Sequence, residues 1–106
     1  MPFEDRTAYV FTVNSISAHA PAAPGVYGIT NAREWIYIGV ADDIRRMLLS
    51  YLSESGTPVM RRGPSGFVFE IRAEWEERTS RQNRLVMEYE PVCNRQANPS
   101  GYDRTG

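Results

Sequence analysis

Lysine is absent from the 106-residue sequence, and cysteine and histidine occur once each, as Cys93 and His19. These counts exclude an intramolecular disulfide framework and any metal site built from several cysteines or histidines. No apolar run approaches the ~20 residues that span a bilayer, and the N-terminus shows no basic segment followed by an apolar one. We therefore expect a cytoplasmic protein without membrane attachment. Cys93 is expected to be a small buried side chain, and His19 to belong to a surface segment.

An excess of positive charge is also missing. The 12 cations are all arginines and are balanced by 13 acidic residues, so the formal net charge is −1. The composition therefore lacks the basic balance that is typical of nucleic-acid-binding domains. Arginine suits bidentate contacts to phosphate or carboxylate groups, but a genomic bias away from lysine explains its exclusive use better than function does. The length, with 42% hydrophobic and 24% charged residues, is ordinary for one globular domain.

The pattern of apolar residues predicts a small α/β (α+β) fold, with a mainly antiparallel three-stranded sheet flanked by helices. Two short strands with a polar link between them predict an antiparallel hairpin. Alternation along its second strand places Tyr37 with Trp35 on one face and Ile36 with Ile38 on the other. One domain is expected at 1–94, with a loose tail at 95–106. The expected elements are a strand within 9–13, hairpin strands at 26–29 and 35–39, a helix from Asp42 or Asp43 to about 55, a loop at 57–65, a strand at 67–72, and a helix from Thr79 or Ser80 to 89.

Two triplets of related composition lie on the two strands of this hairpin. Gly-Val-Tyr ends at Tyr27, and Tyr-Ile-Gly begins at Tyr37. Downstream, the segment Tyr-x-Pro-x-x-Asn closes the last predicted helix and ends at Asn94. In this order the three segments resemble the GIY-YIG nuclease domain, which is found in homing endonucleases and in the nicking subunit of bacterial excision repair. The resemblance covers residues 24–94.

The resemblance implies metal-dependent hydrolysis of phosphodiesters. A tyrosine of the triplets would help to activate water, an arginine on the first helix would stabilise charge on the phosphoryl group, and a glutamate on the second helix would hold magnesium, which prefers carboxylate oxygens. Tyr27 and Tyr37 match the two tyrosines, whereas Met47 stands at the arginine position and Gln82 at the glutamate position. Both departures remove a charge from the expected catalytic centre. Magnesium is therefore expected only if activity is retained, and no other cofactor is expected.

Neighbouring residues offer few substitutes for the missing charges. On the first predicted helix an apolar stripe is formed by Ile44, Met47, Leu48 and Tyr51. By helical geometry Arg46 is expected to face solvent, and Arg45 to lie on the rim of this stripe opposite Met47. Arg78 lies about one turn before Gln82 and is the best candidate to bring a guanidinium toward the site. Gln82 itself heads an inward-facing stripe. It is either a remnant of the metal position or an ordinary glutamine that touches the sheet edge, and the sequence favours neither interpretation.

Charged residues outside the triplets suggest where a nucleic acid would and would not bind. Arg61 and Arg62 in the predicted loop are the best candidates for phosphate contacts, together with Arg78. A solvated acidic edge is predicted at the end of the last strand and in the connection that follows, which disfavours DNA at that edge. Its members are Glu70, Glu74, Glu76 and Glu77.

Three classes of function follow from these observations. The first is a GIY-YIG-type domain that binds DNA or another nucleic acid and has impaired or lost hydrolysis, as the changes at positions 47 and 82 indicate. The second is an active nuclease with a rearranged site, in which Arg78 supplies the guanidinium. The third is a domain that binds a protein partner or a small ligand and has no nucleic-acid role, which the near-neutral charge favours.

Overall fold

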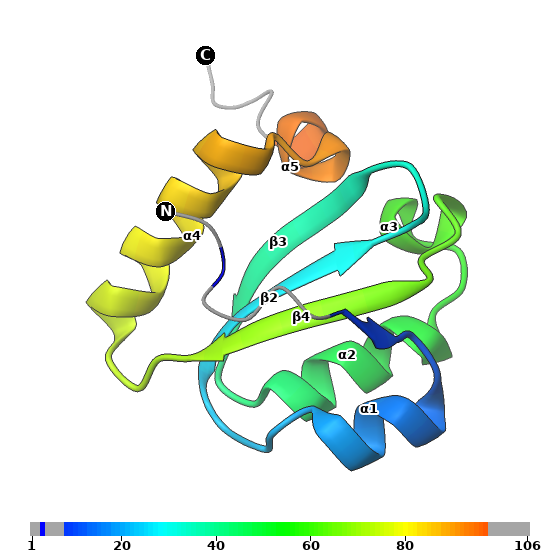
Figure 1. Ribbon diagram of the computed structural model, residues 1–106, viewed down its shortest axis with the longest axis horizontal. Helices are drawn as coiled ribbons and strands as arrows, with labels where there is room; N and C mark the ends of the chain where they lie inside the picture. Colours follow the sequence, from blue (N-terminus) through cyan, green and yellow to red (C-terminus); the bar gives the residue numbers. More distant parts are fainter. Residues whose placement is uncertain (1–2, 4–7, 98–106) are drawn as a thin grey trace.

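The computed structural model describes Phe3 and residues 8–97, the last three of these by their backbone alone (Figure 1). Residues 98–106 of the predicted tail lie outside the described residues. The elements are β1 (Tyr9–Val10), α1 (Val13–His19), β2 (Gly25–Thr30), β3 (Trp35–Ala41), α2 (Ile44–Ser53), α3 (Pro58–Arg61), β4 (Gly66–Ile71), α4 (Trp75–Tyr89) and α5 (Val92–Ala97).

The four strands form one antiparallel sheet in the order β1-β4-β2-β3, which confirms the predicted class of fold. The fourth strand arises because Tyr9 and Val10 pair with the beginning of β4. Helices α1 and α2 cover one face of the sheet, where Ile16 and Leu48 are fully buried. Helix α4 covers the other face through the buried Leu85. No helix in the described part of the chain is long and apolar enough to cross a membrane.

The alternation predicted for β3 is wrong at the start of that strand. The register between β2 and β3 shifts between Ile29 and Thr30, so that Thr30 pairs with Trp35 while Ile29 pairs with Tyr37. Ile36 has no counterpart on β2, as expected at a β-bulge. As a result Ile36 packs in the core beneath α1 and α2, together with Tyr37, and Trp35 packs in the cluster beneath α4.

The helices also differ from the predictions in three places. Helix α4 begins at Trp75, about one turn before Thr79, and carries two glutamates in its first turn, where the helix dipole favours negative charge. Helix α3 forms inside the predicted loop because the Thr57 side chain accepts a hydrogen bond from Met60 N and Pro58 occupies the first turn. Helix α5 was not predicted, and the backbone of 95–97, which was expected to begin a loose tail, continues this helix. Helix α2 begins as predicted, with the Asp43 carboxylate accepting from Arg46 N at 3.0 Å.

Glu70 does not belong to a solvated acidic edge, contrary to the sequence prediction. Its side chain is only 1% exposed, and its carboxylate accepts hydrogen bonds from Arg72 on the same side of the sheet and from Arg81 on α4, with Arg81 Nε at 2.9 Å. A buried carboxylate needs such partners to offset its lost hydration. The ion cluster therefore fastens α4 to β4, and only Glu74, Glu76 and Glu77 remain as exposed members of the predicted edge.

Candidate functional site

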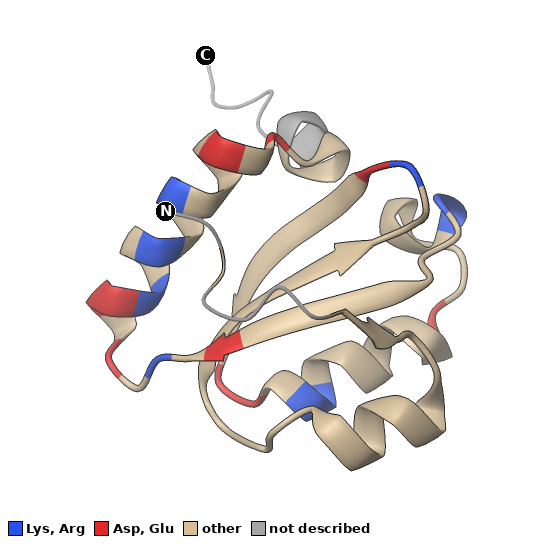
Figure 2. Ribbon diagram, viewed as in Figure 1, with Lys and Arg blue, Asp and Glu red and all other residues tan. Residues whose placement is uncertain are grey.

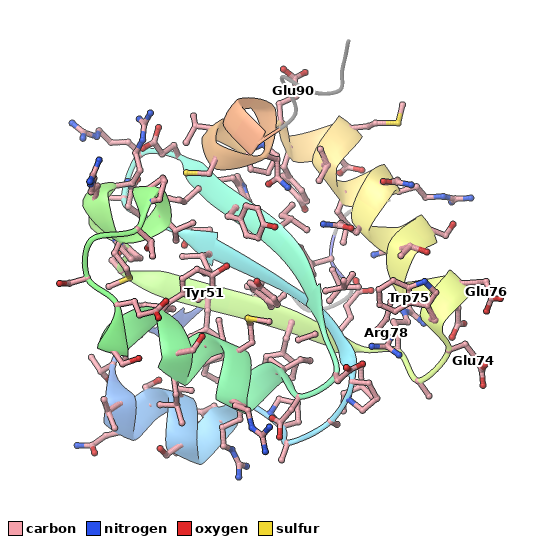
Figure 3. All side chains as sticks on the ribbon, turned by 180° about the vertical axis from the view of Figure 1, so that it is seen from behind. Tyr51, Glu74, Trp75, Glu76, Arg78 and Glu90 are labelled. Atoms are coloured by element: carbon pink, nitrogen blue, oxygen red, sulfur yellow. The ribbon has the colours of Figure 1, made fainter. Side chains whose placement is uncertain are left out.

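Three tyrosines from three elements meet on the sheet face that α2 covers. Tyr27 of β2 lies 6.2 Å from Tyr37 of β3 and 6.1 Å from Tyr51 of α2, measured between ring centroids. The hydroxyl oxygens of Tyr27 and Tyr51 are 2.9 Å apart and share a hydrogen bond. Tyr51 points from α2 toward the sheet (Figure 3). Sequence reasoning placed Tyr51 only in an apolar stripe, although it is the one stripe member with a hydroxyl group.

Close packing requires a glycine in each triplet, at Gly39 against the tyrosine rings and at Gly25 against the backbone of β4. A Cβ atom on Gly39 would lie 2.6 Å from the hydroxyl oxygen of Tyr27 and 2.7 Å from Cε2 of Tyr37. A Cβ atom on Gly25 would lie only 2.0 Å from the backbone oxygen of Glu70. The two glycines therefore allow the Tyr27 ring to lie across β3 and allow β2 to approach β4. Packing alone therefore explains the glycines of the two triplets, whether or not the domain catalyses a reaction.

Burial sets the protonation state of the tyrosine cluster. Desolvation raises the pKa of Tyr27 far above its ordinary range, and the neighbouring Tyr51 adds to the shift. Desolvation also raises the pKa of Tyr37, with a smaller contribution from Cys93, and that of Tyr51, where the hydrogen bond with Tyr27 partly opposes it. All three side chains are therefore neutral hydroxyls near pH 7. Tyr37 makes no hydrogen bond to any other described residue, so its hydroxyl is available to a ligand.

These shifts predict loss of stability in alkaline solution. Because the folded-state pKa values lie above the ordinary value of 10.0, the stability that the neutral hydroxyls contribute is complete below about pH 10 and falls as the pH rises further. Absorbance at 295 nm and far-UV circular dichroism, followed together from pH 9 upward, are expected to show the buried tyrosines ionising only as the helices unfold. Ionisation of all 6 tyrosines near pH 10 with native dichroism would contradict the prediction.

Gln82 and Asn94 close the exposed edge of the sheet beside Tyr37. Strand β3 is an edge strand, and the Asn94 side chain pairs with Ile38 as a neighbouring strand would: its Oδ1 accepts from Ile38 N at 2.8 Å and its Nδ2 donates to Ile38 O at 2.9 Å. Gln82 Nε2 donates to the same oxygen at 3.1 Å. Gln82 therefore touches the sheet edge, as the second of its two interpretations supposed.

The arginine position on α2 holds a side chain that cannot carry charge. Met47 is half-buried against the core and lines a hollow of about 270 Å³ together with Asp42, Asp43, Arg46 and Ser50. Arg46 is exposed, as predicted. Arg45 donates from Nε to Ala20 O at 2.8 Å, which directs it toward the end of α1.

The residues at the metal position that the resemblance implies do not fit a magnesium ion. Magnesium prefers carboxylate oxygens. Position 82 instead supplies an amide, and the nitrogen of this amide donates a hydrogen bond to Ile38 O. No group of three or more histidine, cysteine, aspartate or glutamate side chains in the described part of the chain could hold a metal ion.

The three arginines named from the sequence do not lie together. Arg61 and Arg62 are exposed on and next to α3, and Arg62 lines a shallow hollow of about 400 Å³ with Arg33 of the β2–β3 turn. Figure 2 shows basic positions both at α3 and at this turn. Arg62 also lies 3.7 Å from Glu34. Arg78 is only 7% exposed and lies at the start of α4, where it donates to Asp42 at 2.8 Å and to Ala41 O at 3.2 Å.

Comparison with known proteins supports the resemblance seen in the sequence. No protein-family model and no curated protein matches the chain. Among solved structures, the GIY-YIG N-terminal endonuclease domain of UvrC from Thermotoga maritima bound to magnesium matches with a TM-score of 0.63 and 27% identity, covering 74% of this chain and 91% of that one. A variant of the same domain with a tyrosine replaced by phenylalanine, bound to its catalytic divalent cation, matches at 26% identity with the same TM-score and covers 74% of this chain and 90% of that one.

The spacing of the tyrosines agrees with that likeness. In three structures of the UvrC domain, single tyrosines that are separated by 10 and 14 positions are replaced by phenylalanine. Tyr27, Tyr37 and Tyr51 are separated by the same 10 and 14 positions. The sheet topology, this spacing and the structural likeness together identify the chain as a GIY-YIG-like domain.

Proposed function

We propose that this domain binds nucleic acid and has lost the metal-dependent phosphodiester hydrolysis that its fold supports elsewhere. The proposal rests on the contact made at position 82, where the Gln82 amide donates a hydrogen bond to Ile38 O. An ionised carboxylate has no hydrogen to donate and could not make this contact. Met47 removes the second charge, because a thioether offers no guanidinium to a phosphoryl group. The tyrosine scaffold is retained without the two charged groups that hydrolysis requires.

The arginines around α3 form the proposed phosphate-binding surface. Arg33, Arg61 and Arg62 are all exposed at the end of the sheet where the β2–β3 turn meets α3. This surface borders the tyrosine cluster, because Val59 and Met60 of α3 pack in the same core as Tyr27 and Tyr37. We expect a phosphate backbone held by these guanidiniums to run toward that cluster.

The alternative of an active nuclease with a rearranged site depends on Arg78. Its guanidinium is already bonded to the Asp42 carboxylate and to the oxygens of Ala41 and Ala73. Releasing Arg78 toward a phosphate would leave the oxygens of Ala41 and Ala73 without this donor. Arg78 therefore serves better as a link between α4 and the end of β3. The alternative of a protein-binding domain with no nucleic-acid role is separated from the proposal by the experiment below.

The proposal is tested by measuring the affinity of the protein for a fluorescent 20-mer oligonucleotide, both single-stranded and as a duplex, at increasing salt concentration. We expect affinity to fall with salt, because each phosphate contact releases counterions, and the slope of log affinity on log salt to shrink by about 2 in the Arg61→Gln/Arg62→Gln variant. Arg84→Gln, which removes an exposed arginine from α4, is the matched control and is expected to leave the slope unchanged. Absent or salt-independent binding would reject the nucleic-acid proposal in favour of a protein or small-ligand partner.

A further inference from the structure

Two large apolar side chains are exposed where β4 passes into α4. Ile71, the last residue of β4, is 56% exposed, and Trp75, the first residue of α4, is 55% exposed. Tryptophan gains much free energy from burial, and apolar patches that persist on the surface of small proteins commonly mark interaction sites. Only 72–74 separate the two residues, so both belong to the same corner of the molecule.

The Trp75 ring contacts a fixed cation although more than half of the residue is exposed. The Arg78 guanidinium lies over it, with Cζ 5.1 Å from the ring centroid. Arg78 is itself buried, and its guanidinium donates to Asp42 and to Ala41 O. The guanidinium beside the ring therefore has little freedom to move (Figure 3). A side chain that is ordered before binding loses little conformational entropy on binding. Trp75 therefore has the properties of an interface anchor, since hot spots are enriched in well-ordered tryptophan.

The charge around Trp75 is negative on balance. Glu74, Glu76 and Glu77 are exposed, and none of them forms an ion pair with another described residue. The other acidic groups nearby are neutralised, Asp42 by Arg78 and Glu70 by the arginines around it. In Figure 3 Glu74 and Glu76 extend outward on the same side of Trp75. The corner thus presents an apolar centre bordered by acidic side chains, which repel nucleic acid and attract cationic groups.

We propose that this corner, formed by Ile71, Trp75 and the three glutamates, docks a basic segment of a partner protein. Aliphatic side chains of the segment pack on Trp75 and Ile71, and its arginines or lysines face Glu74, Glu76 and Glu77. The surface is separate from the arginines around α3, so the inference stands whether or not the domain binds nucleic acid. Charge complementarity selects the partner, and apolar burial on an ordered ring supplies most of the affinity.

A fluorescein-labelled 12-residue peptide of alternating arginine and leucine is the probe, and its anisotropy is measured with the full chain. Binding by the natural protein is expected to weaken at least tenfold in Trp75→Ala and in Glu74→Gln/Glu76→Gln/Glu77→Gln. Two controls are matched to these changes: Met87→Ala removes an exposed apolar side chain elsewhere on α4, and Glu54→Gln removes an exposed charge just after α2. Both are expected to bind as the natural protein does.

Tryptophan emission supplies a second readout that reports the location directly. The peptide is expected to change the emission of the natural protein but not that of Trp75→Phe, whose remaining Trp35 is stacked on Tyr89 and Phe3. Replacing the peptide's arginines by glutamate is expected to abolish binding. The inference is overturned if the natural protein does not bind the arginine peptide at millimolar concentration, or if Trp75→Ala binds it as tightly as Met87→Ala does.

Discussion

Replacing Gly25 by alanine is expected to lower the free energy of unfolding by about 3 kcal/mol or more, a large part of the 5–15 kcal/mol that is typical of a domain. The new Cβ atom would stand 2.0 Å from the Glu70 oxygen and 2.8 Å from Cδ1 of Ile44. The isoleucine can change rotamer, but the oxygen belongs to the backbone of the neighbouring strand. Relief therefore requires β2 and β4 to separate at the pair between Gly25 and Ile71.

Urea unfolding followed by circular dichroism measures this loss. Gly56→Ala is the matched control, since nothing lies within 4 Å of its Cβ position, and it is expected to change stability by less than about 1 kcal/mol. Equal midpoints for the two variants would show that the first triplet does not require glycine. The glycine would then have to be explained by something other than strand packing.

Replacing Asn94 by alanine is expected to cost about 3 kcal/mol, because it removes two hydrogen bonds and leaves the buried Ile38 N–H without a partner. Gln82 Nε2 would still donate to Ile38 O, but this nitrogen cannot accept a hydrogen bond from Ile38 N. Hydrogen exchange of the Ile38 amide is therefore expected to speed up in Asn94→Ala by more than in any other variant proposed above that stays folded.

Thermal or urea unfolding gives the energetic part of that prediction. Asn83→Ala, an exposed position on α4, is the control and is expected to be neutral or slightly stabilising, because alanine has the higher helix propensity. If Asn94→Ala unfolded with the natural midpoint and kept a slowly exchanging Ile38 amide, the edge of β3 would be closed by something other than Asn94.

The sequence predicts the parts of the fold that depend on local pattern. The hairpin, the start of α2 at its aspartate cap and the end of α4 before Pro91 follow from alternation, capping and the backbone of proline. The inversion of Trp35 and Ile36 could not be predicted, because a bulge is fixed by the pairing of two strands and not by either one alone. The early start of α4 was missed because its first turn, with its two glutamates, reads as a polar connection.

The site residues also divide into those that the local sequence pattern predicts and those that depend on contacts between distant elements. Tyr27 and Tyr37 follow from the triplets, whereas Tyr51 needs the approach of α2 to the sheet before its hydroxyl can be assigned a partner. The burial of Glu70 and Arg78 could not be predicted, because both residue types are usually exposed. Each is buried only because a partner of opposite charge arrives from another element, and such pairs leave no periodic signal in the sequence.

Nicking of supercoiled plasmid with magnesium or manganese tests most directly whether Met47 and Gln82 deprive this GIY-YIG-like domain of metal-dependent hydrolysis. We predict no nicking by the natural protein, nicking by Met47→Arg/Gln82→Glu, and loss of that activity when Tyr37→Phe is added. Unfolding curves of each variant separate a silent site from an unfolded chain. Nicking by the natural protein that Tyr37→Phe abolishes would contradict the account and show that another arginine and another metal ligand serve the site.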